Sequence, residues 1–272
     1  MDPALPGPPI LPVSSAGDFS GNRINRFFEW FGDLGIFFWR VIRATATPPF
    51  EFRELLRQLD EIGSKSLPLV ALAGAATGVV LSLEARFSLT RFGAKALLPA
   101  AIVFSVIHET GPIITGLVVS GRVGAGIGAE LASMKVTEQI DAIEASAVNP
   151  YRLLAATRIL ACILMLPLLT LAADACGLLM GWVTQALVGP LSLHQFITSG
   201  FKGASFNDLL PPTLKTAVFG LIIGLIACFQ GMRTRGGAAG VGRAATSAVV
   251  LSSLFVILAD VLLVKLIIVF FP

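Results

Sequence analysis

The stretch His108–Pro112, which reads His-Glu-Thr-Gly-Pro, interrupts an apolar segment that runs from about residue 95 to residue 120. A carboxylate at the centre of a membrane-spanning helix costs on the order of 2.5 kcal/mol or more, so such a group normally faces a partner or a water-filled cavity. Glu109 is therefore a candidate functional residue. Pro112 cannot donate a hydrogen bond to the carbonyl of His108, so the pair Gly111-Pro112 predicts a local break in the helix.

The composition around this stretch is that of an integral membrane protein. The chain has 272 residues, of which 55% are hydrophobic and 14% are charged, whereas soluble domains carry about 25% charged residues. Its mean hydropathy is +0.82. The 20 Lys and Arg exceed the 17 Asp and Glu by only three charges, an excess too small to argue for binding to nucleic acid.

Five apolar segments are long enough to cross a membrane, which takes about 20 mostly apolar residues. They cover about residues 66–88, 96–119, 153–188, 213–229 and 244–271. We therefore predict an all-α integral membrane protein with five transmembrane helices, in which residues 66–272 form one membrane domain. The first and fourth segments contain Gly74-xxx-Gly78 and Gly220-xxx-Gly224, a spacing that lets helices pack closely.

The region before the first span has apolar residues at helical spacing and charged residues on the opposite side. Trp30 and Trp39 suit a headgroup boundary, and the stretch is too charged to span a membrane. We predict that residues 21–65 form amphipathic helices that lie in the membrane interface; a small soluble subdomain is the alternative. Residues 1–20 are rich in proline and lack the basic and apolar parts of a signal peptide, so we expect a disordered tail.

Basic residues set the predicted orientation, because they are enriched in cytoplasmic segments. If the N-terminus is cytoplasmic, most Lys and Arg fall on the cytoplasmic side, and an odd number of spans places the C-terminus outside. The outer segments then hold only Arg86, Arg91, Lys95, Lys202 and Lys215.

Glu109 allows two interpretations. The functional one is that its carboxylate faces a central cavity, where it meets a substrate headgroup or a partner helix. The structural one is a contact with His108 or an arginine that only joins helices. Asp174, Asp260 and Lys265 are weaker intramembrane candidates, and the last two are five residues apart, a poor spacing for a pair on one helix.

The segment of residues 121–150 separates the second span from the third. Its glycines at 121, 124, 126 and 128 predict either close helix packing or a flexible exit from the membrane. Thr137 can cap a short helix with Glu138 and Asp141 in its first turn. Such a helix on the cytoplasmic side could dock in a groove of a soluble partner, although an ordinary solvated connector explains the same pattern.

The sequence lacks the motifs of an enzyme. It has no G-x-x-x-x-G-K-[ST] motif, so the chain is not predicted to hydrolyse ATP. It shows no nucleophile–base pair and no metal-ligand spacing, and its three cysteines lie in apolar stretches. We predict no catalytic residue, metal or cofactor here. Energy for active transport would come from an ion gradient or from a separate subunit that binds ATP and magnesium.

Together these motifs resemble the MlaE/YrbE permease family, the membrane subunit of bacterial lipid-transporting ABC systems. The resemblance covers roughly residues 66–266. It rests on His108–Pro112, on SGRVGAGIGAEL at 120–131, on MKVTEQIDA at 134–142, on Asn149-Pro150 with Arg158 following, and on GVGRAAT at 240–246.

The resemblance implies an assembly in the bacterial inner membrane, with the N-terminus cytoplasmic and the C-terminus periplasmic. Two copies of the chain would form the core, two cytoplasmic ABC ATPase subunits would bind it, and a periplasmic MCE-domain substrate-binding protein would continue the lipid path. The phospholipid would lie between the two permeases, near His108, Glu109, Gly111 and Pro112. Coupling to the ATPase would fall on Glu130, Met134, Thr137, Glu138, Gln139 and Asp141.

Two positions depart from the family pattern. His108 stands where the family more often has Arg, and Ala132 stands where Gly is common. A histidine can be neutral at physiological pH, which removes a fixed positive charge for an anionic headgroup.

We therefore predict the permease subunit of an ATP-driven transporter that moves phospholipids between the inner membrane and the periplasm or outer membrane. Two alternatives remain open. One is a secondary transporter that uses Glu109 as a proton-coupled site. The other is a membrane scaffold subunit without a transport path of its own.

Overall fold

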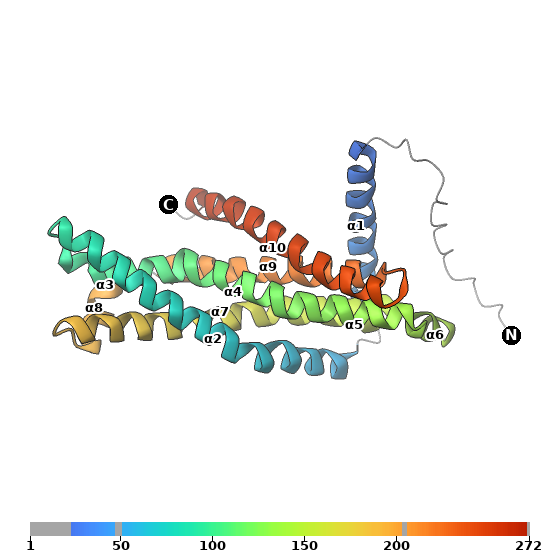
Figure 1. Cartoon of the computed structure of the whole chain (residues 1–272), viewed down its shortest axis with the longest axis horizontal. Coiled ribbons are helices and arrows are strands. Elements are labelled where there is room, and N and C mark those ends of the chain that lie inside the picture. The colour runs from blue at the N-terminus through green and yellow to red at the C-terminus, as the bar shows by residue number, and fades with distance from the viewer. Residues whose placement is uncertain (1–22, 47–50, 203–205, 271–272) are drawn as a thin grey trace.

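A computed structural model describes residues 23–46, 51–202 and 206–270 of the chain (Figure 1). The tail predicted at residues 1–20 lies outside the described residues. Every regular element within the described ranges is helical, so the predicted all-α fold class is confirmed.

The helical elements follow one another along the described chain, and several of them join end to end. Three of them, η2, η3 and η4, are π-helical turns, a geometry found often at functional sites. The order is α1 (Arg23–Ala46), α2 (Phe52–Arg91), η1 (Lys95–Leu97), α3 (Leu98–Ser105), η2 (Val106–Thr110), α4 (Gly111–Val119), η3 (Ser120–Gly124), α5 (Ala125–Val136), α6 (Gln139–Ala145), η4 (Tyr151–Ala156), α7 (Thr157–Val188), α8 (Leu193–Gly200), α9 (Phe206–Met232) and α10 (Gly237–Phe270).

Five helical runs in the described residues are long and apolar enough to cross a membrane. They are Phe52–Arg91, Lys95–Val136, Tyr151–Val188, Leu209–Met232 and Gly237–Val269. Each of the first four runs contains a whole predicted span, and the fifth contains all of its predicted span except the last two residues. The number and order of the spans are therefore confirmed.

The helix that contains the first span begins earlier than the span predicted from the sequence. We predicted an interfacial helix that ends before residue 66, but α2 is one continuous helix. Its buried stripe passes through Leu55, Ile62 and Val70, which are seven and eight residues apart, so one apolar face continues across the expected boundary.

The helical run that contains the second span extends further than the predicted span, because the glycines at 121–128 continue the helix and do not form a flexible exit. A Cβ added at Gly128 would lie 3.0 Å from the Cβ of Ala248 in α10. On the next turn, Leu131 of α5 packs against Gly231 of α9. Close helix packing, the first of the two predicted roles, is therefore observed at Gly124 and Gly128, whereas Gly121 and Gly126 have open space beside them.

The long helices lie side by side along the molecule, while α1 lies crosswise to them (Figure 1). The short helix α6 lies at the same end of the bundle as α1, and α8 lies at the opposite end with the start of α3. Helix α8 lies between the third and the fourth span. The hydroxyl of Ser192 accepts a hydrogen bond from the backbone N–H of Gln195 and caps it.

Helix α1 packs one face on the bundle and exposes another. Phe37 and Val41 are buried, whereas Phe28 and Trp39 are about two-thirds exposed at 67% and 66%. Trp30 stacks on Phe255 and does not project outward. A crosswise helix with exposed aromatic side chains is suited to the membrane interface. That α1 lies in the interface stays a prediction.

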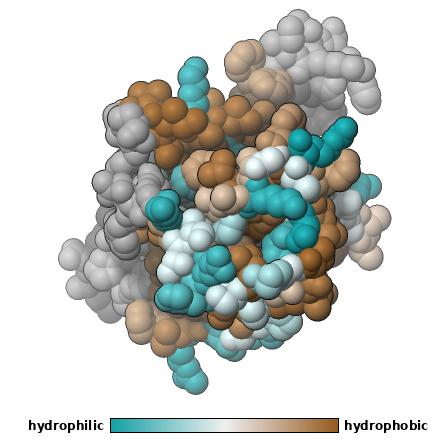
Figure 2. Space-filling model, turned by 90° about the vertical axis from the view of Figure 1, so that its left-hand side faces the viewer, coloured by the Kyte–Doolittle hydropathy of each residue, from teal (hydrophilic) through white to brown (hydrophobic). Residues whose placement is uncertain are grey.

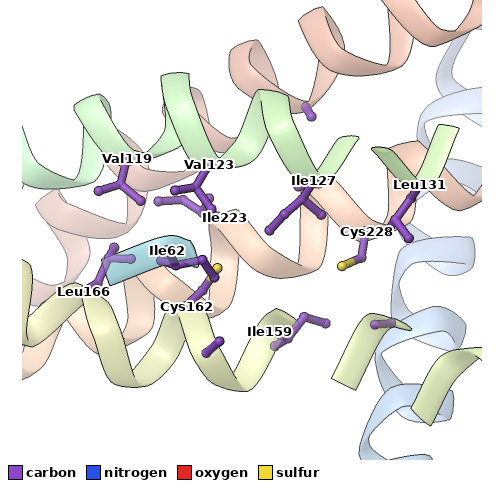
Figure 3. Packing of buried hydrophobic residues seen from close by; sticks show 14 of the residues in the cluster. Ile62, Val119, Val123, Ile127, Leu131, Ile159, Cys162, Leu166, Ile223 and Cys228 are labelled. Carbon is purple, nitrogen blue, oxygen red and sulfur yellow. The ribbon is translucent and has the colours of Figure 1, made fainter. Parts of the chain in front are cut away.

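The main buried core fills the space between the second span and helices α7 and α9 (Figure 3). Its members on the second span recur every four residues and so form one helical stripe. Figure 3 shows Val119, Val123, Ile127 and Leu131 of this stripe, with Ile159, Cys162 and Leu166 of α7 and Ile223 and Cys228 of α9.

The predicted glycine pairs are sites where helix backbones touch. A Cβ on Gly74 or Gly78 of α2 would overlap the backbone carbonyl of Ala173 or Gly177 in α7. A Cβ on Gly220 of α9 would overlap the backbone of α7 in the same way. The close approach confirms the packing role of both motifs.

The end of the bundle at α3 and α8 carries a polar surface (Figure 2). Hydrophilic residues gather over the middle of this end face, with hydrophobic residues above them, below them and to their right in this view. A polar end between apolar flanks is expected of a bundle whose sides face lipid and whose ends face water.

Candidate functional site

The predicted break in the second span is a π-helical turn, Val106–Thr110. Because Pro112 has no N–H, the carbonyl of His108 loses its usual helical partner. The N–H of Gly111 donates to the carbonyl of Val106, five residues back, which closes the wider turn. The helix therefore continues past the proline, and the carbonyl of His108 accepts a hydrogen bond from a side chain.

Lys215 of α9 fills the place left by the missing donor. Its Nζ donates to the carbonyl oxygen of His108 at 2.9 Å and to Oε2 of Glu109 at 3.2 Å, and it lies 2.9 Å from Oδ1 of Asp260 in α10. An ammonium group has three hydrogens and no acceptor, so these three oxygens match its capacity. We call Glu109, Lys215 and Asp260 the charged cluster.

Burial differs sharply within the charged cluster. The side chains of Lys215 and Asp260 are 1% and 3% exposed, whereas that of Glu109 is 50% exposed. The cost of burying a charge falls when an opposite charge is paired with it, and Lys215 and Asp260 form such an ion pair. The cluster joins three helices, which fits the structural interpretation of Glu109. It also leaves Glu109 open to a ligand, which fits the functional interpretation.

Lys215 corrects one expectation from the sequence. We counted it among the basic residues of the outer segments, but it is buried between helices. We also considered Asp260 with Lys265, whereas Asp260 pairs with Lys215. The position of Lys215 just inside the fourth apolar segment was the one signal in the sequence that it could be buried. Nothing in the sequence indicated its partners, because Asp260 is more than 40 residues away and Glu109 more than 100.

An apolar groove adjoins the charged cluster. It has a volume of about 310 Å³ and lies between α9 and α10, at the small end of the range typical of small-molecule sites. Among the described residues that line it, Lys215 is charged and the others are apolar: Leu210, Pro211, Leu214, Val218, Leu263 and Ile267. The site therefore combines a charged end with hydrocarbon walls.

His108, Gly111 and Pro112 have different surroundings from Glu109. The ring of His108 stacks on Phe104, with 4.0 Å between the ring centroids. Gly111 and Pro112 are buried, and Gly111 touches the carboxylate of Asp174 in α7. The cavity that Gly111 lines has a volume of only about 10 Å³, which is at most the size of a water molecule.

The predicted coupling segment forms a sharp turn and a short helix, α6. Glu138 precedes α6 in the left-handed backbone region, with φ of 59°. Thr137 does not cap α6 as predicted, because its hydroxyl donates back to the carbonyl of Ser133 and ends α5 instead. The left-handed residue between them turns the chain so sharply that the hydroxyl cannot reach the first N–H groups of α6.

The residues assigned to coupling fall into an exposed group and a packed group. Glu138, Gln139 and Asp141 are exposed on the turn and α6, and Asp141 pairs with Lys135 of α5 at 2.6 Å. Met134 is half-buried and packs on the main core. The exposed members are available to a partner, whereas Met134 serves the fold.

Glu130 has a specific partner inside the chain. Its Oε1 accepts a hydrogen bond of 2.8 Å from Nη2 of Arg158 in α7, and the side chain of Arg158 is only 3% exposed. Arg158 also donates to the carbonyl of Leu154. This pair ties α5 to α7 close to the ends that lead into and out of α6.

Within the described residues, no three or more His, Cys, Asp and Glu side chains lie in an arrangement that could hold a metal ion.

Comparison with known proteins places these features in a family. A family model described as "Permease MlaE" matches residues 55–266. A probable ABC transporter permease protein of Rickettsia conorii is 36% identical over 246 residues, which cover 90% of this chain and 95% of the relative. A protein of the same description from Synechocystis is 32% identical over 208 residues, 76% of this chain and 79% of the relative.

A plant relative matches as well. The chloroplast protein trigalactosyldiacylglycerol 1 of Arabidopsis thaliana is 33% identical over 224 residues, which cover 82% of this chain and 64% of the relative. The family match spans most of the chain, including the broken helix, the charged cluster and the turn before α6. This multi-pass membrane protein therefore belongs to the MlaE family of ABC transporter permeases.

Proposed function

We propose that this chain is the permease subunit of an ATP-driven phospholipid transporter in the bacterial inner membrane. The observation that carries the proposal is the charged cluster beside an apolar groove of about 310 Å³. A phospholipid has a charged head and hydrocarbon chains, so its site needs a few polar groups beside apolar walls. The name of the Arabidopsis relative contains that of a lipid, and this likeness supports a lipid as the cargo.

Energy would reach the lipid site through α6. The exposed residues Glu138, Gln139 and Asp141 would contact a cytoplasmic ABC ATPase, which binds ATP and magnesium. The buried side chain of Ile140 fixes α6 to the bundle. The position of α6 at the same end as α1 agrees with a cytoplasmic N-terminus (Figure 1).

The second span would carry the movement. One helical run, interrupted only by π turns, connects Glu109 with Val136 just before the coupling turn. At 1.5 Å per residue this distance is about 40 Å. A displacement of α6 would therefore be transmitted along α5 and α4 to the carboxylate of the charged cluster.

Other partners would complete the path. A half-exposed carboxylate at membrane depth is unfavourable against lipid tails, so we propose that a second copy of the chain encloses Glu109 in a shared cavity. A periplasmic MCE-domain protein would receive or deliver the lipid at the end where α3 and α8 lie.

The coupling role is tested by charge reversal with a matched control. The variant Glu138→Lys plus Asp141→Lys should lose a copurifying ATPase and ATP-dependent lipid transfer in reconstituted vesicles. The control Asp60→Lys plus Glu61→Lys reverses the same number of exposed charges on α2, and it should retain both. An ATPase that binds the first variant as well as the wild type would rule out this role of α6. Lipid transport by the isolated chain with an ion gradient alone would favour the secondary transporter.

A further inference from the structure

Asp174 is a buried acid that the charged cluster does not use. It lies near the middle of α7 and is only 5% exposed. Its Oδ1 atom is buried and has no hydrogen-bond partner among the described residues. An ionised carboxylate without a partner is very costly in an apolar interior, so this acid needs a source of neutralisation.

The described part of the chain supplies no cation for Asp174. The helices that pack against α7 include α2, α4 and α9, and no charged side chain in the described ranges acts on Asp174. Residues 67–83 of α2 and all of α4 hold no charged residue. The glutamate of η2 and the lysine of α9 belong to the charged cluster. Arg158 of α7 pairs with Glu130, and the ring of His108 stacks on another ring.

Asp174 faces the π-helical turn η2 across Gly111. A Cβ added at Gly111 would overlap Oδ1 of Asp174 and would lie 2.9 Å from the carbonyl oxygen of Val106. The two oxygens are therefore close neighbours, and two acceptors face each other favourably only when a hydrogen lies between them. The carbonyl of Val106 accepts one hydrogen bond, from the N–H of Gly111, and its second lone pair can accept another.

The space around Asp174 favours a proton over a metal ion. The cavity beside Gly111 has a volume of only about 10 Å³, whereas a bound metal cation takes several oxygen ligands around it. A proton on Asp174 needs no added space, and it supplies the hydrogen between the two facing oxygens.

We propose that Asp174 is a positioning residue for lipid transport, because its carboxyl group keeps its proton and donates a hydrogen bond to the carbonyl of Val106; this inference rests on the proposed function. Helix α7 thereby holds η2 at Val106, while Lys215 of α9 holds the same turn at the carbonyl of His108. Glu109 lies on this turn, so the two hydrogen bonds together fix where its carboxylate meets the lipid.

Three variants of the full-length protein, reconstituted in vesicles with its copurifying subunits, test the hydrogen bond by ATP-dependent lipid transfer. Asp174→Asn has an N–H donor and no charge, so it should transfer lipid at close to the wild-type rate. Asp174→Leu has a similar volume and no donor, and it should slow transfer about two- to tenfold, the range for one buried hydrogen bond. The control Thr170→Val removes a buried hydroxyl one turn away, whose hydrogen bond stays within α7, and it should keep the wild-type rate.

Infrared spectroscopy of the same vesicles detects the proton directly. The difference spectrum of the wild type minus Asp174→Asn should contain the carbonyl stretch of a protonated carboxyl group at neutral pH. The band should be the same in sodium and in choline buffers, because no metal ion neutralises the acid. This measurement does not depend on the folding of Asp174→Leu.

The outcomes separate this inference from the proposed function. A missing carboxyl band, or a band present only without sodium, would show an ionised Asp174 and overturn the inference alone. Transfer lost as strongly in Asp174→Asn as in Asp174→Leu, or equal transfer by the wild type and both variants, would overturn it as well. Absence of ATP-dependent lipid transfer by the wild type would overturn the proposed function and this inference with it.

Discussion

Replacing Lys215 by Met should destabilise the protein strongly. The substitution leaves Asp260, which is 3% exposed, without its cation and removes the donor to the carbonyl of His108. Breaking a buried ion pair by removal of one partner costs about 3 to 5 kcal/mol. Glu109 adds little to this cost, because its half-exposed carboxylate can still be solvated.

A second substitution should reverse most of the loss. In Lys215→Met plus Asp260→Leu, no unpaired buried charge remains, and apolar replacement of a buried ion pair is often neutral or stabilising. The double variant should therefore unfold close to the wild-type temperature. It lacks the cluster cation, so we expect it to assemble but to fail in lipid transfer.

The assay is thermal unfolding of detergent-purified protein, followed by loss of the monodisperse peak in size-exclusion chromatography. Lys265→Met is the matched control, because Lys265 is an exposed lysine on α10, and exposed substitutions usually change stability by less than about 0.5 kcal/mol. If Lys215→Met unfolded at the same temperature as Lys265→Met, or if Asp260→Leu failed to restore stability, the buried pair would not hold these helices together as described.

Two other substitutions probe the helix contacts. Gly78→Ala should destabilise the protein by about 1 to 3 kcal/mol or more, because the new Cβ overlaps the backbone of Gly177. The control Gly126→Ala has open space and should be neutral or stabilising by up to about 1 kcal/mol. Equal melting temperatures of the two variants would contradict the observed contact. Arg158→Gln should leave the ATPase bound but lower its stimulation by lipid, because Glu130 then no longer ties α5 to α7. Unchanged ATPase rates in the assembled complex would refute this role.

The sequence was informative wherever the physical rule is local. Apolar length predicted the spans, glycine spacing predicted backbone contact at Gly74 and Gly78, and the missing N–H of Pro112 predicted a local break in the helix. Each of these follows from residues within a few turns of one another.

The side chain that donates to the carbonyl of His108 could not be predicted in this way. Lys215 lies 107 residues from His108, and the rule that counts basic residues near the ends of spans assigned it to the outer surface. That rule describes average placement and does not detect a lysine whose charge is matched inside the bundle. The prediction that Thr137 caps the short helix was wrong for a related reason. The left-handed backbone at Glu138 changes which N–H groups a capping side chain can reach.

The geometry of the charged cluster also indicates which of its contacts can open during a transport cycle. Lys215 and Asp260 lie on α9 and α10, are both almost fully buried, and are 2.9 Å apart, so separating them would leave two unpaired charges in an apolar interior. Glu109 has the longer contact and half of its side chain exposed, so its separation costs less because solvent or a ligand can replace Lys215. It also lies on the helical run that leads to α6. Movement of α6 should therefore displace Glu109 from a fixed Lys215–Asp260 pair and expose the carboxylate to an incoming headgroup.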